Sequence, residues 1–206
     1  AAGHWSAAAG SALEASIADL PLALAEPFFP AGLQVEGALD GSIEADVSPG
    51  GDLRADARLE TSPGMISYLA REGERARVRF QPASATLRAG PPGVAARVAA
   101  TLDIGTLEGE LRLPDYNRVG LPPAAQRLEG RLVAHISDIS LAQAFTTDLD
   151  ETSGRIDADL AFSGSVERPA IRGSAELKDA SANLPRFGLE LRGLRARLTG
   201  DESGLS

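Results

Sequence analysis

Apolar and polar residues alternate along most of the chain with the two-residue period of a β-strand. The clearest run places apolar residues at every second position from Val94 to Ile104, with Arg97 and Asp103 among the residues between them. Similar runs cover residues 13–19, 33–47, 53–59, 107–113, 128–136, 156–162 and 171–177. Strands with one apolar and one polar face are typical of an antiparallel sheet that has one face in water.

Turns and two short helices are predicted between these strands. Ser-Pro-Gly-Gly at 48–51 and Gly-Pro-Pro-Gly at 90–93 are turn sequences. Residues 22–29, closed by Pro30, and residues 140–145, opened by Ser140, have room for only one or two helical turns. The pattern therefore predicts an all-β fold with two short helices, and a loop at 114–126 that is long enough to be functional.

One phrase of the sequence occurs twice. LEASIADLPLA at 13–23 matches LVAHISDISLA at 132–142 without a gap, and each copy precedes a short helix and a glycine that opens a new strand. The spacing exceeds that of the common solenoid repeats. We therefore expect one continuous domain built from a partial module at 1–127 and the start of a second module at 128–206, within a longer parent chain.

The apolar face of such a sheet needs a cover, and no long amphipathic helix is predicted to supply one. The remaining covers are a second sheet or the curl of the sheet itself. Because this face is rich in Ala and Gly, a curl would stay incompletely filled, as an open aliphatic groove that suits acyl chains. The predicted groove lining consists of Leu39, Ile43, Val47, Val94, Val98, Leu102, Ile104, Leu111, Leu132, Ala134, Ile136, Ile156, Leu160, Phe162, Ile171, Leu177, Leu189 and Leu191.

Composition and motifs argue against several classes of function. The net charge of −9 disfavours nucleic-acid binding, which needs a basic surface. Zero Cys excludes disulfides and thiolate chemistry, and Lys178, the only lysine, lies outside any phosphate-binding Gly-Lys-Ser/Thr motif. His4 and His135, the only histidines, lie far apart in sequence, and neither a nucleophile elbow nor a zinc helix is present. We expect no enzymatic activity and no cofactor.

Two charged clusters are interpreted as solvated surface. The carboxylates of Asp148, Asp150 and Glu151 are followed by Thr152 and Ser153 where a calcium loop needs a ligand and a glycine. Arg192, Arg195 and Arg197 share a basic face that either meets lipid headgroups or, as we favour, keeps the sheet soluble. Neither cluster predicts a metal site.

The chain resembles the TamB family, the inner-membrane subunit of the translocation and assembly module, within the wider group of AsmA-like bridge-like lipid transfer proteins. The resemblance rests on LRLPDY, LEGRLVAHISDISLAQAF and GRIDADLAFSGSVERPAIRGSAELKDASANLPRFGLELRGLRARLTG, which together cover most of 105–200. It is looser over residues 13–59, where the repeated phrase occurs again.

This resemblance implies a long sheet curled into an open apolar groove, a β-taco, that spans the periplasm as part of a parent anchored in the inner membrane of a Gram-negative bacterium. It implies transfer of phospholipid toward the outer membrane, with support of outer-membrane protein assembly and autotransporter secretion. Its implied partners are phospholipid acyl chains and, through parts of the parent outside this chain, the outer-membrane protein TamA. A purely structural periplasmic spacer and a closed β-sandwich binding module remain as alternatives.

Overall fold

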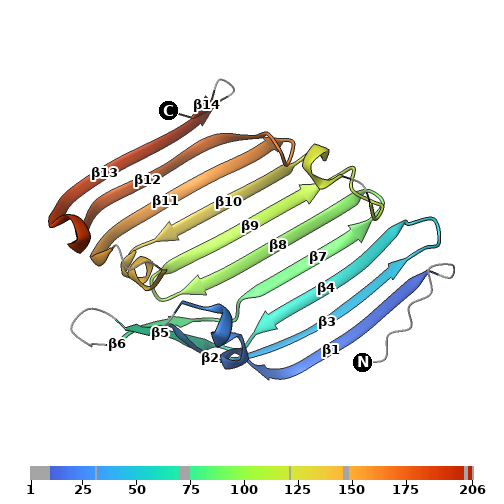
Figure 1. Ribbon diagram of the computed structural model, residues 1–206, viewed down its shortest axis with the longest axis horizontal. Helices are drawn as coiled ribbons and strands as arrows, with labels where there is room; N and C mark the ends of the chain where they lie inside the picture. Colours follow the sequence, from blue (N-terminus) through green and yellow to red (C-terminus); the bar gives the residue numbers. More distant parts are fainter. Residues whose placement is uncertain are drawn as a thin grey trace.

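The computed structural model describes residues 10–30, 32–69, 75–120, 122–145, 149–201 and 204–205. These residues form one 14-stranded antiparallel sheet (Figure 1). Its main path runs in chain order through β1 (Ser11–Pro21), β3 (Ala38–Val47), β4 (Leu53–Thr61), β7 (Ser84–Gly90), β8 (Gly93–Leu102), β9 (Gly105–Leu113), β10 (Glu129–Ile136), β11 (Asp150–Gly164), β12 (Pro169–Leu184), β13 (Leu189–Asp201) and β14 (Gly204–Leu205). The mostly β fold predicted from alternation is confirmed.

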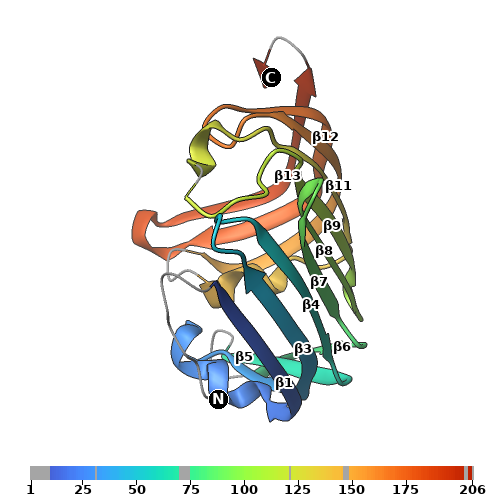
Figure 2. The ribbon, with the colours of Figure 1, turned by 90° about the vertical axis from the view of Figure 1, so that its right-hand side faces the viewer.

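Three strands leave this path. β5 (Gly64–Leu69) pairs with β2 (Gln34–Glu36) and with β6 (Arg75–Phe80). Within the described residues, β6 pairs with the main sheet at one position, where Phe80 lies opposite Leu102 of β8. In Figure 2 this small unit runs across one end of the main strands. We call it the floor.

The apolar run over residues 33–47 is divided between two strands at Gly37, the glycine that was expected to open a new strand. Gly37 has a φ of 136°, which residues with a side chain rarely adopt, and its N-terminal and C-terminal sides enter different parts of the sheet. β2 pairs with β5 in the floor, whereas β3 pairs with β1 and β4 in the main sheet. Alternation continues across the break, so it gave no sign that the pairing partner changes.

The two predicted helices are present as 3-10 helices. η1 covers Leu22–Phe28 and η4 covers Ser140–Phe145. Two further 3-10 turns, η3 at Pro123–Ala125 and η5 at Pro185–Phe187, lie between strands. Pro27 within η1 removes a backbone donor and limits that helix to a short segment. Among the described residues no helix is long and apolar enough to cross a bilayer.

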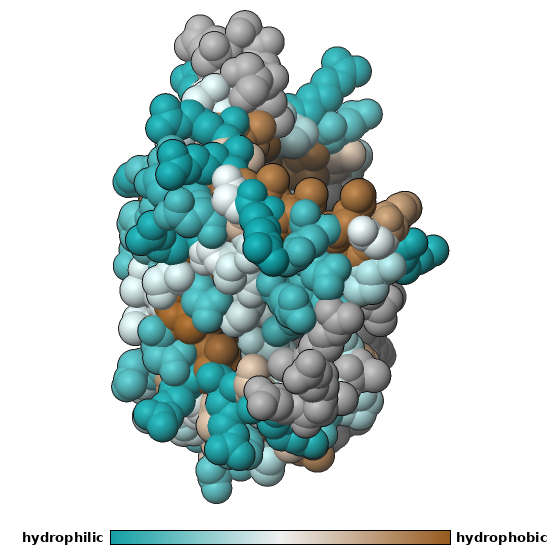
Figure 3. All heavy atoms as spheres, turned by 90° about the vertical axis from the view of Figure 1, so that its left-hand side faces the viewer, coloured by the Kyte–Doolittle hydropathy of each residue, from teal (hydrophilic) through white to brown (hydrophobic). Residues whose placement is uncertain are grey.

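The main sheet is curved, and the connecting segments gather on the side toward which it bends. Figure 2 shows η1, the floor and the segment containing η3 all on this concave side. In Figure 3 a row of apolar side chains is exposed toward the same side, while polar side chains predominate on the opposite side, where a smaller apolar patch lies among them. The sheet is open, with β1 and the β13–β14 pair at its two ends.

A compact core lies between the floor and one end of the main sheet. Leu33, Val35 and Phe80 are buried together there, and Leu22, Ile66 and Leu102 pack against them. Tyr68 and Val78 of the floor are 1% and 3% exposed. Most of the buried hydrophobic side chains among the described residues therefore belong to or adjoin the floor.

Candidate functional site

The register of the main sheet gathers its apolar residues on one face. Val98 of β8 lies opposite Gly109 of β9, which lies opposite Leu132 of β10, which lies opposite Leu160 of β11. Because side chains alternate between the two faces, this row and its parallel neighbours form one aliphatic surface from β1 to β13. We call it the apolar face.

All but one of the predicted lining residues lie in main-sheet strands and share this face. Their pairing connects Leu39, Ile43, Val47, Val94, Val98, Leu102, Leu111, Leu132, Ala134, Ile136, Ile156, Leu160, Phe162, Ile171, Leu177, Leu189 and Leu191. Ile104 does not belong to the row, since β8 ends at Leu102 and β9 begins at Gly105. Ile104 instead lies in the turn, where its carbonyl accepts a hydrogen bond from the backbone N–H of Ser137 at 2.7 Å.

A bulge in β12 keeps apolar residues on this face where alternation fails. Leu177 and Ala180 are three residues apart, yet their partners Ala196 and Leu194 are two apart, so both side chains share one face. Asp179 takes up the extra residue with a φ of 48°. Strict alternation would place Ala180 on the polar face, but it is only 2% exposed.

Similar irregularities occur in β1 and β13. The register shifts between Ile17 and Leu20, where Asp19 has a φ of 51°. In β13, Gly193 has a φ of 62°, and Leu194 returns to the apolar face. Sequence reasoning missed Leu194 because an extra residue interrupts the alternation; the available signal was a glycine beside a break in the pattern.

The apolar face is open to solvent along much of its length. Leu13, Val98 and Leu111 are 53%, 47% and 44% exposed. Gly109 lies against the side chain of Val98, since a Cβ at position 109 would come within 3.0 Å of Val98 Cγ2. No second sheet covers this face within the described ranges, so the closed sandwich alternative is not supported.

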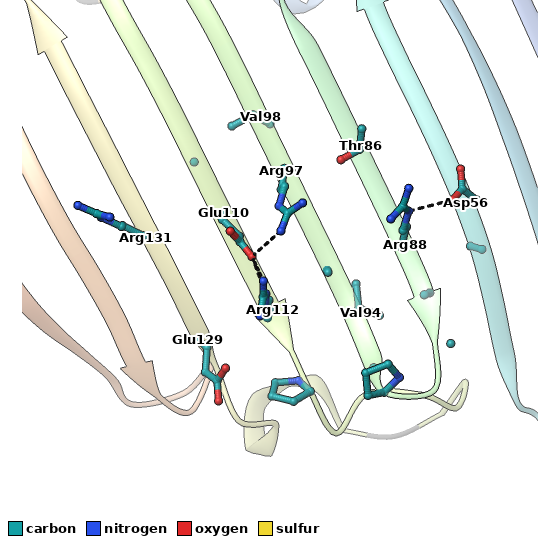
Figure 4. A pocket seen from close by; sticks show the side chains of 18 of the residues that line it. Asp56, Thr86, Arg88, Val94, Arg97, Val98, Glu110, Arg112, Glu129 and Arg131 are labelled. Atoms are coloured by element: carbon teal, nitrogen blue, oxygen red, sulfur yellow. Dashed lines mark hydrogen bonds and ion pairs between the residues drawn. The ribbon is translucent and has the colours of Figure 1, made fainter.

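The opposite face carries a network of ion pairs. Glu110 accepts hydrogen bonds from Arg97 and Arg112, and Arg88 pairs with Asp56 at 3.2 Å (Figure 4). These side chains line a hollow of about 1090 Å³ beside the Pro91-Pro92 turn. Since its cations already have carboxylate partners, this hollow has the character of a solvated ionic surface, and the apolar face remains the candidate site.

Hydrogen bonds from cations lower the pKa of several carboxyl groups on this polar face. Arg97, and then Arg112, lowers the pKa of Glu110. Arg131 donates to Asp159 at 2.9 and 2.7 Å and lowers the pKa of that carboxyl group. These two carboxyl groups are therefore held in their charged form by arginines of the same face.

Residues considered as catalytic or basic candidates belong to the same network. His135 is exposed and its Nδ1 lies 3.1 Å from Asp157, which also accepts a hydrogen bond from Lys178. The hydrogen bonds from His135 and Lys178 lower the pKa of Asp157. His4 and Asp148 lie outside the described residues.

The three C-terminal arginines predicted as a basic face each pair with a carboxylate. Arg192 pairs with Glu190, Arg195 with Asp179, and Arg197 with Glu176. Their charge is therefore balanced by carboxylates of the same sheet.

The chemistry available on the apolar face is hydrophobic contact. Moving a methylene group from water onto an aliphatic surface is worth at most about 0.8 kcal/mol, so an acyl chain of about a dozen methylenes that is half covered gains roughly 5 kcal/mol. An open face can accept such chains at many positions along its length, because the contact is non-directional. It is suited to holding or guiding apolar chains.

Fold and site together define an open, single-sheet β-groove with an aliphatic interior and an ion-paired exterior. The family model for the TamB N-terminal domain matches residues 4–177. The chain therefore belongs to the TamB family, whose association is with the translocation and assembly module and with transport rather than enzymatic catalysis. The comparisons with curated proteins and with solved structures gave no match.

Proposed function

We propose that this chain is a segment of a periplasm-spanning conduit that shields phospholipid acyl chains as they pass between the inner and outer membranes. In this proposal the parent protein is anchored in the inner membrane and meets TamA through parts outside this chain. Lipid supply then supports outer-membrane protein assembly and autotransporter secretion. Membership of the TamB family supports the proposed location between the two membranes, and the apolar face supports the proposed shielding of acyl chains.

The continuity of the apolar face is the observation that carries this proposal. Aliphatic side chains lie opposite one another across each strand pair of the main path between β1 and β13, from Leu13 opposite Ala45 to Ala175 opposite Leu198. Ten strands at about 4.8 Å each give roughly 45–50 Å of such surface. A spacer would need only a folded sheet, and water-exposed aliphatic residues add nothing to its stability.

The test places a carboxylate on the apolar face. Val98→Asp and Ile136→Asp introduce a charge mid-strand among aliphatic neighbours, where an acyl chain cannot solvate it. Val98 is 47% exposed, so the fold should tolerate the change while bound phospholipid falls about tenfold, by the cost of desolvating the charge. The measurement is phospholipid per protein after purification, with thermal midpoints recorded in parallel.

Two variants on the polar face serve as controls. Ala95→Asp adds the same charge but lies between Arg88 and Arg112, its cross-strand neighbours, and should leave both lipid content and stability unchanged. Arg97→Glu changes the charge further but breaks the ion pair with Glu110, so a small loss of stability without loss of lipid is expected. Wild-type lipid content in the folded Val98→Asp and Ile136→Asp variants would refute the conduit and favour the spacer.

A further inference from the structure

The connection between β9 and β10 is far longer than the fold requires. These two strands are antiparallel neighbours, and such strands can be joined by a two-residue turn. The chain instead leaves β9 at Leu113 and enters β10 at Glu129. The intervening segment, described for residues 114–120 and 122–128, reaches the hairpins on both sides of the β9–β10 pair. We call it the strap.

At its first half the strap pairs with the β3–β4 hairpin. Arg118 forms an isolated antiparallel bridge with Asp52, framed by hydrogen bonds from Leu53 N to Asn117 O at 2.9 Å and from Val119 N to Gly51 O at 2.8 Å. The guanidinium of Arg118 also lies 3.3 Å from the Asp52 carboxylate. To make these contacts, the strap passes the β7–β8 hairpin, which separates β4 from β9 in the sheet.

At its second half the strap pairs with the β11–β12 hairpin. Arg127 forms a second isolated antiparallel bridge, to Ser165. It is framed by hydrogen bonds from Leu128 N to Gly164 O at 2.9 Å and from Val166 N to Gln126 O at 3.1 Å. The strap is thus fixed to one hairpin on each side of the strands that it connects.

The strap has little slack between these two anchors. From β4 to β11 the sheet has five strand spacings, or about 24 Å at about 4.8 Å each. The nine steps from residue 118 to residue 127 reach at most about 32 Å when fully extended, and η3 shortens them. An attached strap therefore limits how far this rim of the sheet can open.

None of the strap residues whose burial the structure describes is buried, so its described attachments to the rest of the molecule are the two anchors. Figure 2 shows the segment containing η3 on the concave side of the sheet, at the opposite end of the strands from the floor. Arg118, Val119, Ala124 and Ala125 are exposed, and Val119 is 52% exposed. A segment with exposed hydrogen bonds and few buried apolar contacts opens far more readily than the strands beside it.

We propose that the strap is a releasable clasp that controls sideways access of acyl chains to the apolar face between β4 and β11. When attached, it holds the two hairpins together along one rim and keeps that rim narrow. When either anchor releases, the rim opens without unfolding the sheet, because the main strands do not depend on the strap for pairing. The gating role rests on the proposed lipid function, whereas the release of the strap does not.

Engineered disulfides can lock each anchor, since the chain has no cysteine of its own. In both bridges the framing hydrogen bonds belong to the flanking residues, so Asp52 with Arg118 and Arg127 with Ser165 are non-hydrogen-bonded pairs. Such pairs bring Cα atoms to about 4.5 Å, within the range of a disulfide. The variants are D52C/R118C and R127C/S165C. The control is R58C/T86C, which links two facing residues of β4 and β7 on the polar face and leaves the strap free.

Hydrogen exchange tests release independently of lipid. In the wild-type chain the amides of Leu53, Val119, Leu128 and Val166 should exchange at least about a hundredfold faster than that of Leu132 within β10, because they open locally. In the oxidised D52C/R118C and R127C/S165C variants, the amides at the locked anchor should exchange more slowly than in the wild type. In the oxidised R58C/T86C control, their exchange rates should not change. Anchor amides as protected as Leu132 would overturn the proposal.

Uptake of a fluorescent phospholipid from vesicles of phosphatidylethanolamine and phosphatidylglycerol tests the gating role. With both anchors locked, uptake should slow about tenfold, because the open state is no longer populated, and reduction should restore it. Equal rates in the locked and control proteins would overturn gating even if the strap opens. If no variant takes up phospholipid, the proposed conduit fails and gating fails with it, while hydrogen exchange still decides whether the strap releases.

Discussion

The floor and the main sheet share the same alternation of apolar and polar residues, but their apolar faces differ in burial. In the floor, Val78 and Tyr68 are almost completely buried. In the main sheet, Val98 has the same strand context, yet it is 47% exposed. An alternating strand therefore creates an apolar face, but whether that face becomes a core or an open surface depends on what packs against it.

This difference separates stability from function within one chain. The cluster of Leu33, Val35 and Phe80 anchors the floor to one end of the main sheet. The open apolar face gains its stability from strand pairing and from ion pairs on the opposite side, and it leaves its aliphatic side chains available to a ligand. Substitutions in the floor should therefore mainly lower stability, whereas substitutions on the apolar face should mainly affect ligand binding.

The largest contrast is expected from the same substitution in both regions. Val78→Ala removes two buried methyl groups next to the core and should lower the free energy of unfolding by about 2–3 kcal/mol, as the sum of lost transfer energy and a residual cavity. Val98→Ala removes the same groups from an exposed position and should cost less than about 1 kcal/mol. Chemical denaturation of the two variants measures both values, and equal losses would mean that the apolar face is covered in solution.

A smaller effect is expected from the hydrogen bond that ties the floor to η4. The hydroxyl of Tyr68 donates to Ser140 Oγ at 3.0 Å, across 72 residues of sequence. Tyr68→Phe keeps the ring and loses this bond, so it should cost about 1 kcal/mol. Ser140→Ala should cost slightly more, because it leaves the buried tyrosine hydroxyl without its partner.

The double variant Tyr68→Phe/Ser140→Ala completes the cycle for this bond. Because both partners are then absent, its loss should be smaller than the sum of the two single losses. Additive losses would show that the floor and η4 are not coupled through this contact. Unfolding free energies from urea denaturation provide all three values.

The smallest effect concerns the ion pairs of the polar face. The pKa of Asp159 is lowered by Arg131, so the folded state binds its proton less readily than the unfolded state does. Its contribution to stability is therefore present above the ordinary carboxyl pKa of about 4 and is lost as pH falls through the lower folded value. Asp159→Asn should destabilise slightly at pH 7, and its difference from wild type should shrink below about pH 4.

A matched variant separates this pairing from a general effect of charge. Glu44→Gln removes one negative charge from the same face, and Glu44 lies opposite Glu14 and Asp56 with no cationic partner among the described residues. It should not reproduce the pH-dependent difference seen with Asp159→Asn. Urea denaturation at pH 7 and at pH 3 compares the two, and identical profiles would contradict a specific role for the Arg131 pair.

Much of the apolar face could be predicted because the signal is local. A strand's two faces follow from residue parity alone, which is why Val94, Val98 and Leu102 could be placed together on one face. Ile104 lies outside the row because β8 ends at Leu102, two residues before the end of the alternating run. The position of η4 was predictable for a similar reason, since Ser140 and its neighbours break the strand pattern on their own.

Partner choice could not be predicted, because it depends on residues far away in the chain. Nothing near Gly37 indicates that β2 will pair with β5 while β3 joins β1. The bulge at Asp179 is likewise defined by the mismatch between β12 and β13, and it exists only when both strands are in place. The strap was predicted as a long loop. Its two anchors pair with segments 51–53 and 164–168, and each of these segments lies more than 35 residues along the chain from the strap residues that it pairs with.

The sequence by itself determined that the chain forms strands with one aliphatic and one charged face, since that requires only the period of its side chains. It also sufficed to place the chain in the TamB family, whose N-terminal domain model matches residues 4–177. Only the tertiary structure decided which part of the aliphatic surface is closed by the floor and which part stays open. The reason is that closure depends on the curvature of the whole sheet and on contacts such as that of Phe80 with Leu102, which no local pattern encodes.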